Sequence, residues 1–120
     1  MALHDDQVSL QQMRDSTRKA LSLGASRSQA DLADDWVATL ALMQLLQIIG
    51  EAARRLSDSI REQHPDVPWG QIIGLRNRLI HGYDDVDHDI VWQIVTTDVP
   101  LLELELSRSL PDEGQHDRPG

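Results

Sequence analysis

The feature that most constrains the fold is a helical segment that is apolar around nearly its whole circumference. Residues 36–49 are interrupted by only three polar side chains, those of Thr39, Gln44 and Gln47. A helix that is apolar all round must be covered all round. A bundle of about four helices in a 120-residue chain cannot easily supply that cover. We therefore expect a second copy to pack on this helix. The alternative is a central helix surrounded within one monomer.

The first part of the chain reads as two helices. The first is predicted over residues 6–23, with Gly24 as its stop and Val8, Leu10, Met13, Thr17, Ala20 and Leu21 directed inward. Ser28 is positioned to cap a short turn. The second helix is predicted to be the longest, from Asp34 or Asp35 to Gln63, where His64-Pro65 ends it.

The second part of the chain reads as two more helices. One is predicted to start at Pro68, a favoured residue in the first turn, and to stop at Gly82. Asp87 can cap the last helix, and Pro100 predicts a kink near residues 97–99. The sequence therefore predicts an all-α fold, a four- to five-helix up-and-down bundle over residues 1–110 that oligomerises through the long second helix. Residues 111–120 are predicted to form a disordered polar tail.

Composition limits the classes of function. The formal net charge is −9 and the chain has three Trp, one Tyr and no Phe, so a general nucleic-acid binder with a basic stripe or a base-stacking platform is excluded, DNA binders included. Any RNA must be held at a small local positive site. The absence of Cys excludes disulfides, thiolate zinc sites and a Cys nucleophile, and it fits a cytoplasmic protein. No signal peptide is visible, and the interrupted apolar segment is expected to be too short to span a membrane.

Residues 75–83 contain the strongest chemical motif, R-x-x-x-x-H-x-Y, formed by Arg76, His81 and Tyr83. Arg carries a permanent charge and a planar set of donors that suits phosphate, and His can transfer protons near neutral pH. Arg76 is suited to stabilise extra charge on phosphorus, and His81 to act as general acid or base at an RNA 2′-hydroxyl or leaving oxygen. This scheme requires no metal.

Helical geometry places these side chains on adjacent faces. Arg76 and Tyr83 are two turns apart on one face, whereas His81 lies on the next face, above Asn77 and Arg78. If Gly82 ends the helix, the negative end of the helix dipole should raise the pKa of His81. Two copies related by a two-fold axis would offer two His and two Arg around one cleft. Arg76 and Arg78 with their symmetry mates would then form a positive island.

Several alternatives remain open for these residues. The spacing alone is weak, because Arg76 and Arg78 can form a solvated helix face and His81 can be a capping residue. A metal set of His81 and His88 with Asp84, Asp85, Asp87 and Asp89 has plausible spacing, but acids between two helices are mostly caps and solvated loop residues. Glu51 is predicted to be an acid in apolar surroundings that pairs with Arg54, Arg55 or Arg76, rather than a catalytic group.

The sequence resembles the HepT-like branch of the HEPN superfamily over most of its length. The motif in residues 75–83 resembles the family signature. So do the segments 48–57, 64–69, 72–77, 86–87, 89–92 and 98–100. The resemblance is weakest before Asp34 and in the tail.

The resemblance implies a function. It implies the toxin of a HepT/MntA-type toxin–antitoxin pair, a metal-independent endoribonuclease without cofactor, with Arg76 and His81 catalytic. Asn77, Arg78 and Glu51 would support the site. It implies homodimers or larger assemblies, an RNA substrate, and a minimal nucleotidyltransferase antitoxin that silences the toxin by adding AMP to Tyr83. Such an adduct would occupy the cleft and repel RNA. The alternatives are a non-catalytic nucleotide- or partner-binding module and, third, a purely structural bundle.

Overall fold

The computed structural model describes residues 2–79 and 88–110, and every regular element in these two ranges is a helix. The helices are α1 (Ala2–Ala25), α2 (Gln29–Asp34), α3 (Trp36–Arg55), α4 (Asp58–Gln63), α5 (Trp69–Ile73), α6 (Leu75–Leu79), α7 (His88–Gln93), the π-helix η1 (Ile94–Asp98) and α8 (Val99–Ser109).

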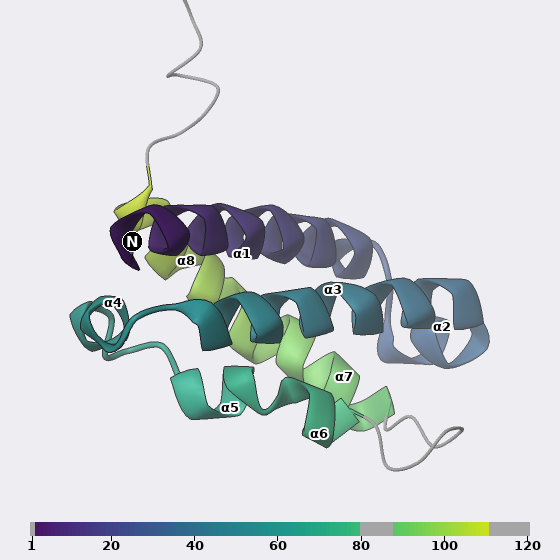
Figure 1. The fold of residues 1–120 in the computed structure, drawn as a ribbon. Coiled ribbons are helices and arrows are strands. Elements are labelled where there is room, and N and C mark those ends of the chain that lie inside the picture. Colours follow the sequence, from purple (N-terminus) through teal and green to yellow (C-terminus); the bar gives the residue numbers. More distant parts are fainter. Residues whose placement is uncertain (1, 80–87, 111–120) are drawn as a thin grey trace, which may run out of the picture.

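These helices form a bundle with four principal helical segments, called arms here: α1, α3, α5 with α6, and α7 with η1 and α8 (Figure 1). The long helices α1 and α3 lie side by side, and η1 and α8 pack against α1. Helices α5 and α6 form a third arm along α3, while α7, η1 and α8 make up the fourth. The short helices α2 and α4 lie at opposite ends of α3. The predicted all-α bundle is therefore confirmed.

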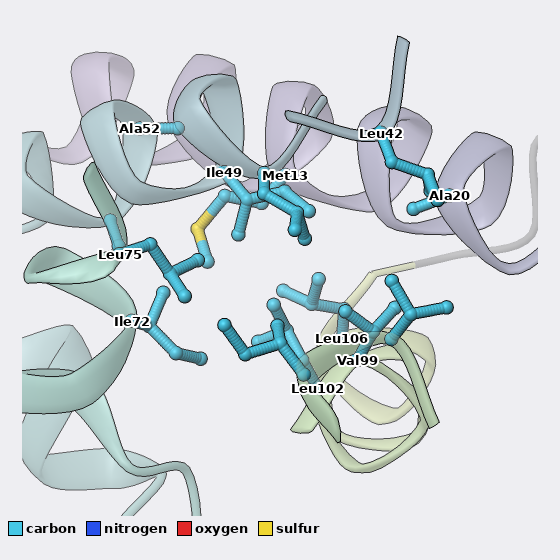
Figure 2. Packing of buried hydrophobic residues seen from close by; sticks show 14 of the residues in the cluster. Met13, Ala20, Leu42, Ile49, Ala52, Ile72, Leu75, Val99, Leu102 and Leu106 are labelled. Carbon is cyan, nitrogen blue, oxygen red and sulfur yellow. The ribbon is translucent and has the colours of Figure 1, made fainter. Parts of the chain in front are cut away.

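The core lies where the four arms meet (Figure 2). Met13 from α1, Leu42 and Ile49 from α3, Ile72 from α5 and Leu102 from α8 are at most 2% exposed. Their burial supplies the main driving force for folding, at roughly 25 cal/mol per Å² of apolar surface removed from water. Because α3 contributes to this core along its whole length, it forms the central support for the other arms.

Helix α1 begins at Ala2, four residues before its predicted start, and its inward pattern and its end need one correction each. Leu10, Met13, Thr17 and Ala20 are buried and Leu21 is half-buried, as predicted, but Val8 is 44% exposed. Gly24 lies inside the helix and is not its stop. A Cβ atom at Gly24 would come within 2.7 Å of a Val95 methyl group, so the glycine permits the close approach of α1 to η1.

The predicted second helix ends at Gln63 as expected, but it is interrupted at residues 56 and 57. Helix α3 ends at Arg55, Leu56 is extended, and Ser57 caps a separate helix, α4. The buried carboxylate of Asp6 accepts hydrogen bonds from the Ser57 backbone N–H at 2.9 Å and from its hydroxyl at 2.8 Å. This contact spans 51 residues, so local pattern could not indicate it.

The connection between α4 and α5 is fixed by an indole and an imidazole. The Nε1–H of Trp69 donates to the carbonyl oxygens of Arg61 and His64. The His64 Nδ1 lies 3.5 Å from Glu105 Oε1, and its Nε2 lies 2.9 Å from Ser109 Oγ. Together these contacts hold the connection against α8.

The predicted third helix is divided in two at Gly74. Pro68 directly precedes α5, and Gly74 separates α5 from α6. The predicted stop at Gly82 and the predicted cap at Asp87 lie outside the described residues. The cap predicted at Ser28 is confirmed, because its hydroxyl accepts from the Asp31 N–H at the start of α2.

The irregularity predicted before Pro100 takes the form of the π-helix η1. The Val99 N–H donates to the Ile94 carbonyl, five residues back, in place of the usual four. Pro100 lacks an N–H, so a regular α-helix would lose one hydrogen bond here. The wider turn accommodates the proline while Ile94, Val95 and Val99 all remain buried.

Candidate functional site

Helix α6 carries the first residues of the sequence motif. Its two leucines, Leu75 and Leu79, are 2% and 0% exposed and anchor the helix in the core. Between them, Asn77 is exposed and Arg78 is half-buried. Arg76 lies in the same helix, but its side chain falls outside the described part of the structure, as do His81 and Tyr83. The geometry that the motif predicts for these three side chains stays a prediction.

Arg78 pairs with a carboxylate that the sequence analysis missed. Its Nη1 lies 3.7 Å from Oδ2 of Asp98, the last residue of η1, and the Asp98 side chain is only 16% exposed. That distance is too long for a hydrogen bond, and this buried nitrogen has no hydrogen-bond partner in the described part of the chain. The pair is therefore an electrostatic contact that links the motif helix to η1. Pro100 predicts an irregular turn in this region, but it does not predict the direction of the Asp98 side chain.

Glu51 does not have the environment that was predicted for it. Its side chain is exposed, and no hydrogen bond or ion pair joins it to Arg54, Arg55 or any other described residue. The predicted pairing with Arg54 or Arg55 is wrong, because Glu51 points away from the core beside solvent. A pairing with Arg76 concerns a side chain outside the described part.

A hollow of about 230 Å³ lies between α3 and the end of α5. Its polar lining comes from one face of α3, with spacings of three and four residues, and its apolar lining comes from both helices. We call it the polar hollow, and its lining residues are Gln44, Gln47, Ile48, Gly50, Glu51, Arg54 and Ile73. A Cβ atom at Gly50 would stand 2.8 Å from the Ile72 carbonyl oxygen, so this glycine allows α5 to approach α3.

A second hollow, of about 410 Å³, lies between α1 and α3 on the other side of Ile48 and Glu51. Gln12, Asp15 and Ser16 of α1 line it together with Arg55. Ile48 and Glu51 line both hollows and so form a ridge between them.

The N-terminal part of α3 leaves three large apolar side chains uncovered. Trp36 is 71% exposed, Val37 58% and Leu40 53%. We call these three residues the apolar patch. The expectation that this helix cannot be covered by one copy of the chain agrees with their exposure.

Helix α3 also has the length and composition of a membrane-spanning segment, contrary to the prediction that its apolar run is too short. It is the one such helix among the described residues and has 20 residues. Half of its most apolar stretch is buried inside the bundle. The core helices of soluble proteins share this pattern.

The metal-site alternative falls mostly outside the described residues, since His81, Asp84, Asp85 and Asp87 all lie between the two described ranges. Within those ranges no group of three or more His, Asp or Glu side chains is arranged to hold a metal ion. Asp89 accepts a hydrogen bond from Gln29 and thereby joins α7 to α2.

Comparison with known proteins gives a family match over most of the chain. The model of the family described as "Ribonuclease HepT-like" matches residues 13–109, which include the whole motif and both hollows apart from Gln12. No solved structure gives a significant match to the chain.

Several curated proteins are similar to half or more of the chain. A "Putative RNase" of Methanocaldococcus jannaschii is 46% identical over 66 residues, which are 55% of this chain and 61% of that protein. A "Putative RNase" of Caldanaerobacter subterraneus subsp. tengcongensis is 40% identical over 83 residues, 69% of this chain and 74% of that protein. A "Probable ribonuclease HepT" of Thermococcus cleftensis is 36% identical over 63 residues, 52% of this chain and 57% of that protein.

Proposed function

The chain belongs to the HepT-like ribonuclease family, and on that premise we propose that it is a metal-independent endoribonuclease that cleaves RNA with Arg76 and His81. The observation that carries the proposal is the family match over residues 13–109, within which the chain retains R-x-x-x-x-H-x-Y. Similar proteins are named "Putative RNase" or "Probable ribonuclease HepT", which supports the same reaction class.

In the proposed reaction, two side chains share the chemistry. His81 takes the proton from an RNA 2′-hydroxyl, whose oxygen attacks the adjacent phosphorus, and a protonated His81 of a second copy donates a proton to the departing 5′-oxygen. Arg76 stabilises the added negative charge on the phosphoryl oxygens. Arg78 adds a second positive charge to the same helix, and Asp98 at 3.7 Å restrains its guanidinium.

We further propose that the active form is a homodimer or larger homo-oligomer that buries the apolar patch. Trp36, Val37 and Leu40 are each more than half exposed, and their burial against the same patch of a second copy would remove them from water. Helix α6 packs on α3, so two copies joined through α3 would bring their motif helices to a shared cleft.

The finer biological role follows from the same family membership. We propose that the chain is the toxin of a two-gene type VII-like toxin–antitoxin pair, acting in the cytoplasm. A nucleotidyltransferase antitoxin would transfer AMP from ATP to the Tyr83 hydroxyl and release pyrophosphate. The phosphate of the adduct would introduce negative charge beside Arg76 and compete with RNA. A second candidate is a non-catalytic nucleotide- or partner-binding module, which the polar hollow favours because its polar lining has no partners of its own.

RNA digestion in the presence of EDTA tests the proposed activity. We expect the wild-type protein to cleave RNA, and the His81→Ala protein to lose at least 100-fold in rate, since a methyl group cannot transfer a proton. His88→Ala is the matched control, because it removes a histidine of α7 outside the motif. Equal cleavage by the His81→Ala and wild-type proteins, or a requirement for added divalent metal, would contradict the assignment.

The role of Tyr83 is tested separately. Tyr83→Phe removes only the hydroxyl, so cleavage should persist while nucleotidylation is lost. Mass spectrometry after incubation with the partner nucleotidyltransferase and ATP should show AMP on the wild-type chain and none on the variant. Adduct on a Ser or Thr would contradict this part of the proposal.

A further inference from the structure

The polar hollow brings together four side chains that have no partner among the described residues. Gln44, Gln47, Glu51 and Arg54 form no hydrogen bond or ion pair within the described part of the chain, although Glu51 and Arg54 carry opposite charges and line the same hollow. Several acids and bases elsewhere in the structure do pair, for example Arg61 with Asp58 and Arg108 with Glu105. The donors and acceptors of the polar hollow are therefore free for a ligand.

The chemistry of this lining matches one nucleobase. An ionised carboxylate only accepts hydrogen bonds, and an Arg only donates them. Guanine offers two adjacent donors, N1–H and N2–H, on its Watson–Crick edge and two adjacent acceptors, O6 and N7, on its Hoogsteen edge. Adenine, cytosine and uracil do not present two adjacent donors. Glu51 and Arg54 are thus complementary to the two edges of guanine.

The size and walls of the polar hollow fit the same ligand. Its volume of about 230 Å³ is below the range of roughly 300–1,000 Å³ usual for drug-sized ligands, so it suits a single base. Ile48 and Ile73 provide apolar walls for the base faces, and Gln44 and Gln47 add amide groups that can both donate and accept.

The position of the polar hollow connects it to the motif. Ile73, the last residue of α5, lines it, and the motif helix α6, which contains Arg76, begins two residues later at Leu75. Gly50, which also lines it, lies opposite Ile72 and Leu75, so the polar hollow is close to the start of the motif helix. A base seated there would place its own phosphate near α6. An unpaired Glu51 beside RNA phosphates would only repel them, unless it recognises donors on a base.

We propose that the polar hollow is a guanine subsite, in which Glu51 accepts from N1–H and N2–H and thereby selects RNA with a guanine next to the cleaved bond. This inference rests on the proposed ribonuclease function, whose substrate it specifies. It concerns binding, so it can be tested without cleavage.

The test measures binding of the full chain to short 2′-O-methyl RNA, which lacks the nucleophilic hydroxyl and cannot be cut by this chemistry. Fluorescence anisotropy compares three hexamers: all uridine, uridine with one guanosine, and uridine with one adenosine. We expect the guanosine hexamer to bind about 10-fold more tightly than the other two. Glu51→Gln should abolish this preference while all-uridine affinity stays equal or rises, because a negative charge is removed.

Asp15→Asn is the matched control. It also removes one exposed carboxylate, from the neighbouring hollow, and should leave the guanine preference intact. Wild-type protein without a guanine preference, or a Glu51→Gln protein that keeps it, would overturn the proposal. So would disulfide-linked dimers of a Gln47→Cys protein, because a second copy would then cover the polar hollow. If guanine preference is found but unmodified RNA is never cut, the ribonuclease proposal fails while the guanine subsite stands.

Discussion

The two ends of the outward face of α3 place different demands on their surroundings. The N-terminal end carries the apolar patch, and the C-terminal end carries the polar hollow. Apolar surface is relieved by any well-fitting apolar cover, because the hydrophobic effect has no direction. Hydrogen-bonding groups in a hollow require a ligand whose donors and acceptors correspond to theirs. One helix can therefore join copies of the chain at one end and select a ligand at the other.

The largest expected effect concerns the apolar patch. Leu40→Glu should weaken self-association by about 100-fold, since each interface would lose two leucine side chains and bury two charges without partners. Sedimentation at a series of concentrations measures the change, and RNA cleavage should fall with it. Leu104→Glu is the matched control, because Leu104 is similarly exposed, at 49%, but lies on α8. Equal weakening by both variants would show that the apolar patch is not the interface.

A smaller effect, on the free energy of unfolding, is expected where α3 and α5 meet beside the polar hollow. This effect should not depend on the apolar patch. Gly50→Ala adds a Cβ atom 2.8 Å from the Ile72 carbonyl oxygen, a backbone atom that must move. We expect the free energy of unfolding to fall by about 2 kcal/mol, as for an overpacked core, while self-association is retained.

Gly70→Ala is its control, because a Cβ atom there meets nothing within 4 Å. The unfolding free energy of this variant should stay level or rise by up to about 1 kcal/mol, through better helix propensity. Urea denaturation of both variants gives the comparison. A Gly50→Ala protein as stable as the wild type would mean that α5 can move away from α3 without cost.

The smallest effect is expected at the link between the motif helix and η1. A double-mutant cycle with Arg78→Gln and Asp98→Asn should give a coupling below about 1 kcal/mol, because the pair is 3.7 Å apart, not hydrogen-bonded, and part-exposed at Arg78. The Arg61–Asp58 pair, whose Asp58 is 89% exposed, should give a coupling near zero. A coupling above about 2 kcal/mol for Arg78 and Asp98 would show a much closer contact than 3.7 Å.

The sequence predicted those features that depend on local pattern. The helical class, the Ser28 cap and the irregular turn before Pro100 follow from periodicity, capping chemistry and the missing N–H of proline. The break after α3 was missed although Ser57 is a typical cap residue, because local pattern does not show that Asp6 accepts two hydrogen bonds from Ser57.

The candidate site shows the same division. The motif placed Asn77 and Arg78 on a helix, as found. Gln44 and Gln47 looked like interruptions of an apolar run, and only their position beside Ile73 of α5 gives them a shared hollow. The pairing of Arg78 with Asp98 depends on how η1 turns, which a proline alone does not specify.

The π-helix η1 also affects which chain lengths this bundle can accept. A π turn holds one more residue than the α-helical turn it replaces, without rotating the helices on either side relative to one another. A chain one residue shorter at Thr96 or Thr97, both exposed, could therefore join α7 directly to α8 and still direct Val91, Leu102 and Leu106 inward. Such a chain would lose the contact of Asp98 with Arg78, and it would place Pro100 inside a regular α-helix at a cost of about 3 kcal/mol. A single-residue deletion here would therefore test two roles of η1 separately. Core packing would be retained, whereas the contact that links the motif helix to η1 would be lost.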